Sequence, residues 1–120
     1  MNVLLLEDDA LVANGLMRIL RRLGHHGHHV RTVAQGQALL ASQPQVQVDV
    51  AMVDVGLHDG ESGLEFVTWL RREHGEVRRV VMSGLAPPPG FGHQPPHELF
   101  VRKPFGEPEL VAALTPETRS

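Results

Sequence analysis

One stretch of the sequence decides the fold, VAMVDVGL at residues 50–57. Four apolar residues are followed by a single carboxylate, Asp54, and then by Gly56. A run with apolar side chains on both faces is typical of a strand that helices cover on both sides, as in a parallel sheet. Asp54 would then lie at the carboxyl end of this strand, which is the edge where such folds bind ligands. An Asp after a strand is more often a helix cap or a turn residue, so its partners must decide its role.

The pattern around this stretch repeats the same unit. Val3–Leu6 is apolar and breaks into EDD at residues 7–9, which predicts a second central strand with acids at its carboxyl end. Apolar positions from Ala10 to Leu23 have helical spacing, and Gly24 is a natural stop. The central strand itself is expected over residues 49–53. The other elements are expected as strands at 30–33, 77–82 and 99–102, and as helices at 35–42, 64–72 and 107–114.

Alternating strands and helices predict the topology. With short connections they imply an α/β fold, a five-stranded parallel sheet in the order 2-1-3-4-5 with helices on both faces. Residues 85–97 depart from the alternation, because five prolines and two glycines keep most of this segment from being helical. A fourth helix between the fourth and fifth strands is therefore expected to be shortened or missing. The 120 residues are expected to form a single domain.

The patch GHHGHH at residues 24–29 is the one low-complexity segment of the sequence. Imidazoles bind Zn²⁺, Ni²⁺ or Cu²⁺. Adjacent histidines around a flexible glycine, however, lack the fixed spacing of a structured site. We expect an exposed loop that arose by a short duplication, in which metal binding would be adventitious.

Chemically useful side chains follow four of the predicted strands: Glu7 and Asp8, Asp54, Ser83, and Lys103. The carboxyl ends of parallel strands share one edge, so these residues can converge. Carboxylates that lie close together repel, and ionising all of them requires a cation. Oxygen ligands with an open coordination shell suit Mg²⁺, and a lysine with a small hydroxyl suits an anion. Together they predict a site that receives a phosphoryl group on a carboxylate.

The same residues resemble the receiver domains of two-component response regulators, over essentially the whole chain. The resemblance rests on LLEDD at residues 5–9, VDVGL at 53–57 with DGESG at 59–63, VMSG at 81–84, and VRKPF at 101–105. It implies a flavodoxin-like receiver fold and a phosphorelay. The domain would be a signalling switch that phosphorylates and dephosphorylates itself, and not a turnover enzyme.

The resemblance also implies roles for the site residues. Asp54 would be the phosphoacceptor and would take the phosphoryl group from the phosphohistidine of a sensor histidine kinase or a phosphotransfer protein. Asp8, Asp54 and the backbone carbonyl of Gly56 would bind Mg²⁺, and Glu7 would reach it through water. Lys103 would pair with the phosphoryl group.

Other positions follow by the same resemblance. Ser83 would hydrogen-bond the phosphoryl oxygen, and Phe100 would turn inward on activation. The Lys103–Pro104 peptide bond is expected to be cis, and Asp9 is expected to begin the first helix. Each residue also has a structural alternative: Asp8 and Asp9 as helix caps, Ser83 as a turn hydroxyl, Lys103 as a surface lysine, and Phe100 as a core residue.

Two other readings stay open. The first is a pseudo-receiver, an interaction module of the same fold that is never phosphorylated; the intact acids, Ser83 and Lys103 count against it. The second is an enzyme with an aspartyl nucleophile, such as a haloacid-dehalogenase-like phosphatase. That family requires a second acid two residues after the nucleophile, where this sequence has Gly56.

Composition limits the partners and the location. A net charge of −3 argues against a surface that binds nucleic acid directly. The absence of cysteine, of an apolar run of transmembrane length and of a signal peptide predicts a cytoplasmic protein that does not bind membranes. The partners expected are the histidine kinase and a downstream effector protein, with a homodimer left open. The chain would be a stand-alone receiver or a segment of a longer protein.

Overall fold

The computed structural model describes residues 1–42, 47–56, 63–84 and 98–115. Five strands lie side by side in one sheet in the order β2-β1-β3-β4-β5, and every neighbouring pair is parallel. This is the strand order of flavodoxin-like folds, as the sequence predicted. The elements are β1 (Asn2–Leu6), α1 (Ala10–Arg22), β2 (His26–Val30), α2 (Val33–Ala41), β3 (Val50–Asp54), α3 (Gly63–Glu73), β4 (Arg78–Ser83), β5 (Glu98–Arg102) and α4 (Glu107–Leu114).

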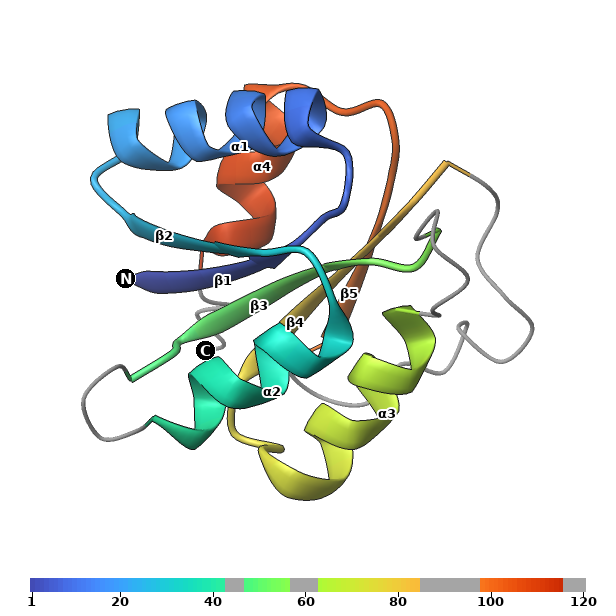
Figure 1. Ribbon diagram of the computed structural model, residues 1–120. Coiled ribbons are helices and arrows are strands. Elements are labelled where there is room, and N and C mark those ends of the chain that lie inside the picture. The colour runs from blue at the N-terminus through green and yellow to red at the C-terminus, as the bar shows by residue number, and fades with distance from the viewer. Residues whose placement is uncertain (43–46, 57–62, 85–97, 116–120) are drawn as a thin grey trace, which may run out of the picture.

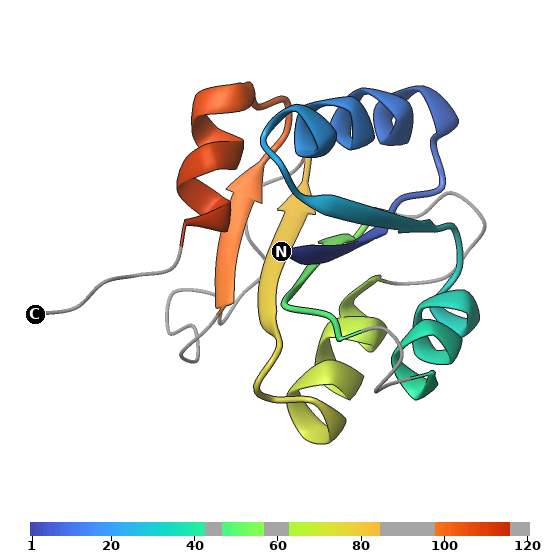
Figure 2. The ribbon, with the colours of Figure 1, turned by 90° about the vertical axis from the view of Figure 1, so that its left-hand side faces the viewer.

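Helices cover both faces of the sheet, with α1 and α4 on one face and α2 and α3 on the other (Figures 1 and 2). The apolar core is divided accordingly. Leu20 of α1 and Leu110 of α4 pack with one set of strand side chains, and Leu40 of α2 and Phe66 of α3 pack with the other. All five residues of β3 are buried, which explains why the sequence of this strand is apolar on both faces. No helix among the described residues is long and apolar enough to cross a membrane.

The second strand differs from the prediction. It spans His26–Val30, so most of it lies in the histidine patch that was predicted to be a loop, and residues 31–33 of the predicted strand are not part of it. Pairing with β1 decides its position, because Asn2 pairs with His26 and Leu6 pairs with Val30. Thr32 then caps α2 by accepting a hydrogen bond from the Gln35 N–H, which ends the extended segment.

Gly27 allows α1 to pack closely on this strand. A Cβ atom at this position would lie 2.6 Å from the sulfur of Met17. The glycine that suggested a flexible loop is therefore a packing residue in a strand.

The predicted loss of the helix between the fourth and fifth strands concerns residues 85–97, which lie outside the described part of the chain. Most of the DGESG motif, residues 59–62, lies outside it too. The other helices and strands lie within a few residues of their predicted bounds.

Candidate functional site

Three acids meet at the carboxyl edge of the sheet. Glu7 and Asp8 follow β1, and Asp54 is the last residue of β3. Leu6 pairs with Val53, so the register of the two strands places Glu7 beside Asp54. Each of the three contributes a carboxylate oxygen to a cluster in which these atoms lie within 4.8 Å of one another. Glu7 and Asp54 are only 1% and 4% exposed, so their charges are largely removed from water.

Lys103 reaches this cluster from the end of β5. Its Nζ lies 2.7 Å from Glu7 Oε1 and 3.3 Å from Asp54 Oδ2. The Lys103 backbone N–H donates to the carbonyl of Ser83 at 2.7 Å, which ties it to the end of β4. The Lys103–Pro104 peptide bond is cis, as expected.

Burial and charge act together on these groups. Burial raises the pKa of the Glu7 carboxyl, the neighbouring Asp54 raises it further, and the hydrogen bond from Lys103 opposes both. Burial alone would lower the pKa of the Lys103 ammonium, but its hydrogen bond to Glu7 and the nearby carboxylates outweigh that effect and raise it. One ammonium cannot balance three ionised acids. The site therefore favours a further cation.

The donor set fits Mg²⁺. Magnesium prefers oxygen ligands at about 2.0–2.1 Å in an octahedron, so ligand oxygens on opposite sides of the ion are about 4 Å apart. The carboxylate oxygens of the three acids lie within 4.8 Å of one another, which is close enough for one ion to contact all three. Glu7, Asp8 and Asp54 are the residues that could hold the ion. The backbone of Gly56 adjoins them, because its N–H donates to Asp54 Oδ1 at 3.0 Å.

The other residues predicted for the site are Ser83 and Phe100, and Asp9 was predicted to begin the first helix. Ser83 is buried at the end of β4, on the strand next to Asp54. Phe100 lies within β5 and packs, partly buried, against the core on the α2 and α3 face. Asp9 begins α1, as predicted, and its side chain accepts from the N–H groups of Leu11 and Val12. The helix cap is thus Asp9, and Asp8 is left for the acidic cluster.

Sequence reasoning missed two residues, one in β2 and one just after it, that contact the backbone of the acidic segment. His29 Nε2 lies 2.6 Å from the backbone carbonyl of Glu7, and Arg31 Nη2 lies 3.3 Å from that of Asp8. A carbonyl can only accept, so His29 carries a proton on Nε2. These bonds satisfy carbonyl groups just beyond the last paired residues of β1. Only the correct register of β2 could have revealed them.

A third missed position is Gly63, at the start of α3. A Cβ atom there would lie 2.2 Å from the Asp54 carbonyl oxygen. Only glycine lets the helix begin this close to the end of β3. The sequence signal was present in the motif DGESG, which ends at this residue.

Comparisons with known proteins agree with this architecture. The family model of the response regulator receiver domain matches residues 3–115. The chain is 27% identical over 120 residues to the transcriptional regulatory protein VxrB of Vibrio cholerae, covering 98% of this chain and 46% of VxrB. It is 28% identical over 112 residues to the phyllosphere-induced regulator PhyR of Methylorubrum extorquens, covering 93% of this chain and 41% of PhyR. The chain thus spans less than half the length of these two relatives.

Solved structures share the fold. A response regulator receiver protein from Sinorhizobium medicae superimposes with a TM-score of 0.82 at 21% identity, covering 95% of this chain and 90% of that one. A response regulator from Burkholderia pseudomallei, solved with a phosphorylated aspartic acid, a calcium ion and citrate, gives a TM-score of 0.79 at 22% identity, covering 95% and 66%. Because the family model spans nearly the whole chain, the protein belongs to the response regulator receiver domain family.

Proposed function

We propose that this receiver domain accepts a phosphoryl group on Asp54 and acts as a phosphorylation-controlled switch. The observation that carries the proposal is the contact of Lys103 with Asp54 and Glu7 inside the acidic cluster, at the carboxyl edge of the parallel sheet. A carboxylate beside a fixed ammonium and a divalent-cation site is suited to phosphoryl transfer, which depends on positioning and charge neutralisation.

In the proposed reaction an Asp54 carboxylate oxygen attacks the phosphorus of a phosphohistidine. The O–P bond forms as the N–P bond breaks, and the leaving imidazole nitrogen keeps the electron pair and takes a proton. Lys103 neutralises charge on the transferred group, and Ser83 donates a hydrogen bond to one of its oxygens. Bound Mg²⁺, held by Asp8, Asp54 and the Gly56 carbonyl with Glu7 through water, would supply further neutralisation. Water later removes the phosphoryl group, so the state is transient.

The switch would be read by other proteins. The added phosphoryl charge would favour a second packing of the domain, with Ser83 and Phe100 as the moving residues. We propose a sensor histidine kinase or phosphotransfer protein as donor and an effector protein as output, in the cytoplasm.

A surface next to the site supports a protein donor. A hollow of about 310 Å³ between α1 and residues 103–105 borders Lys103, and Leu11 on its rim is 84% exposed. Apolar side chains exposed beside a phosphoryl-accepting site suit a partner protein better than a small phosphate donor alone.

The test is the intact mass of the protein after incubation with Mg²⁺ and acetyl phosphate. The wild type should gain one phosphoryl group and lose it with time, while Asp54→Asn should gain none. Asp49→Asn serves as the matched control, because Asp49 is an exposed aspartate at the opposite end of β3. If the wild type gained no phosphoryl group and bound no Mg²⁺, the phosphoacceptor proposal would fail and a pseudo-receiver would replace it.

A further inference from the structure

The histidine patch has a defined geometry because it forms the edge strand β2. Successive side chains of a strand point to opposite faces. Gly27 faces α1, where its Cβ would meet Met17, and Val30 packs in the core with α2 and α3. His26 and His28 therefore project on the α2 side of the sheet, two residues apart on one face, and His29 projects on the α1 side.

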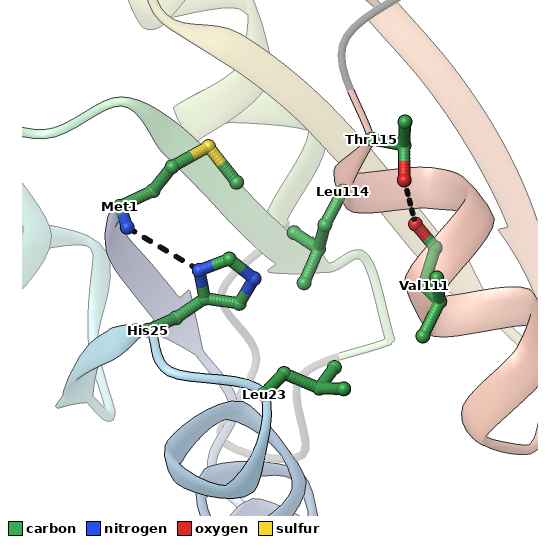
Figure 3. A pocket seen from close by; sticks show the side chains of 6 residues that line it. All are labelled: Met1, Leu23, His25, Val111, Leu114 and Thr115. Carbon is green, nitrogen blue, oxygen red and sulfur yellow. Dashed lines mark hydrogen bonds between the residues drawn. The ribbon is translucent and has the colours of Figure 1, made fainter.

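The other two imidazoles are already engaged elsewhere. His29 Nε2 contacts the Glu7 carbonyl at 2.6 Å, beside the acidic cluster. His25 Nδ1 lies 3.3 Å from the Met1 amine, in a hollow of about 360 Å³ that Leu23 and Leu114 also line (Figure 3). Burial, with the charge of that amine, lowers the pKa of His25.

The remaining pair is open to a ligand. His26 is exposed, and its side chain makes no hydrogen bond or ion pair within the described residues. His28 is partly buried, and its Nε2 lies 3.2 Å from Asn2 Oδ1. The Asn2 amide nitrogen donates to the Gln47 carbonyl, so Oδ1 is the acceptor and His28 carries its proton on Nε2. Its Nδ1 lone pair remains available.

We propose that His26 and His28 form a two-imidazole site for a transition-metal cation, with Cu²⁺ bound most tightly and Ni²⁺ and Zn²⁺ less so. Residues two apart on a strand have Cα atoms about 6–7 Å apart, so both rings can reach one ion. Imidazole suits these metals, and their order follows general affinity trends. A metal-binding histidine commonly donates its other N–H to an oxygen, as His28 does to Asn2. Water would complete the coordination shell.

This site differs in chemistry from the acidic cluster. Carboxylates favour Mg²⁺, whereas imidazole nitrogens favour the softer transition metals. In a titration, excess Mg²⁺ would therefore occupy the acidic cluster, and the added Cu²⁺ would bind to the histidines of β2. His26 and His28 pair with Asn2 and Leu4 of β1, so the ion would be bound nearer the amino end of β1 than the acids, which follow its carboxyl end.

The test is a calorimetric titration of the untagged protein with Cu²⁺ in excess Mg²⁺. Removing one of two chelating groups should weaken binding roughly a hundredfold, by the usual gain from linked ligands. His26→Ala and His28→Ala should each show this loss, and His25→Ala and His29→Ala should bind as the wild type does. His26→Ala is decisive, because the side chain is exposed and its removal should leave the fold intact.

Electron paramagnetic resonance of the Cu²⁺ complex gives a second readout. Two coordinated nitrogens are expected in the wild type and one in His26→Ala. An equal loss in all four variants would mean a diffuse patch and overturn the proposal. Loss in His25→Ala alone would place the ion at the amino terminus and would also overturn it, as would wild-type affinity in His26→Ala.

Discussion

Replacing Glu98 by glutamine should remove a large part of the protein's stability. Glu98 begins β5, and its carboxylate is fully buried between two arginines. Arg79 Nε lies 2.8 Å from Glu98 Oε1, and Arg71 Nε lies 2.9 Å from the same oxygen. Arg71 also pairs with the second carboxylate oxygen. This cluster joins α3 and β4 to β5.

The magnitude follows from which charges can escape to water. The side chain of Arg71 is 39% exposed and can turn outward, but that of Arg79 is 3% exposed and cannot. The glutamine variant therefore removes the negative charge that faces the buried guanidinium of Arg79. Breaking a buried pair in this way lowers the free energy of unfolding by about 3–5 kcal/mol. We expect the lower end of this range because only one of the two arginines must stay buried. For a domain of this size the Tm should fall by roughly 10 °C.

Urea unfolding followed by the fluorescence of Trp69 measures this loss. Trp69 is the single tryptophan of the sequence and stacks on Phe66 in α3, at 5.7 Å between ring centroids. The matched control is Glu107→Gln, which breaks the exposed pair of Arg22 and Glu107. An exposed pair contributes less than about 1 kcal/mol. Equal losses in the two variants would refute the account of the buried cluster.

In the wild type, the ion pairs of Glu98 should make the free energy of unfolding depend on pH in the acid range. Burial alone would raise the pKa of Glu98, but the hydrogen bonds and charges of Arg71 and Arg79 outweigh it and lower the pKa below its usual range. A carboxyl with a lowered pKa stabilises the folded state above its unfolded pKa, and this stabilisation is lost as the pH falls through the folded pKa. The Glu98→Gln variant should lack this part of the acid dependence of unfolding.

Three further changes test the site. Lys103→Ala should leave Mg²⁺ binding intact, as measured by calorimetry, and should stop signalling, as measured by the response of an effector protein. Loss of Mg²⁺ binding would contradict this. Gly63→Ala should cost about 1–3 kcal/mol in urea unfolding, because the new methyl group clashes with the Asp54 carbonyl; wild-type stability would show that the contact relaxes freely. His29→Ala should weaken Mg²⁺ binding up to about tenfold, whereas His28→Ala should not, because His29 contacts the Glu7 carbonyl and His28 contacts Asn2 instead; equal Mg²⁺ affinities of the two variants would show that His29 does not position the acids.

The central strands could be predicted because burial on both faces leaves a continuous apolar run. Parallel topology then places Glu7, Asp8 and Asp54 at one edge, and Lys103 follows from the end of the fifth strand. These positions depend only on strand order and direction. The structure confirms both.

The position of β2, one of the two edge strands, could not be predicted in the same way. Four of the five residues in β2 are histidine or glycine, and pairing with β1 outweighs their weak strand preference. Because β2 was predicted as residues 30–33, the contacts of His29 and Arg31 with the acidic segment were missed. Pairing with β1, which is distant in the sequence, decides the register of β2, and no local sequence pattern predicts that register.

The most direct test of the central claim is to locate the phosphoryl group. Borohydride reduces an aspartyl phosphate to homoserine, so peptide mass spectrometry after phosphorylation with acetyl phosphate identifies the modified residue. The account predicts homoserine at position 54, only in the presence of Mg²⁺, and none in untreated protein. Modification at another carboxylate, with Asp54 unchanged, would contradict it.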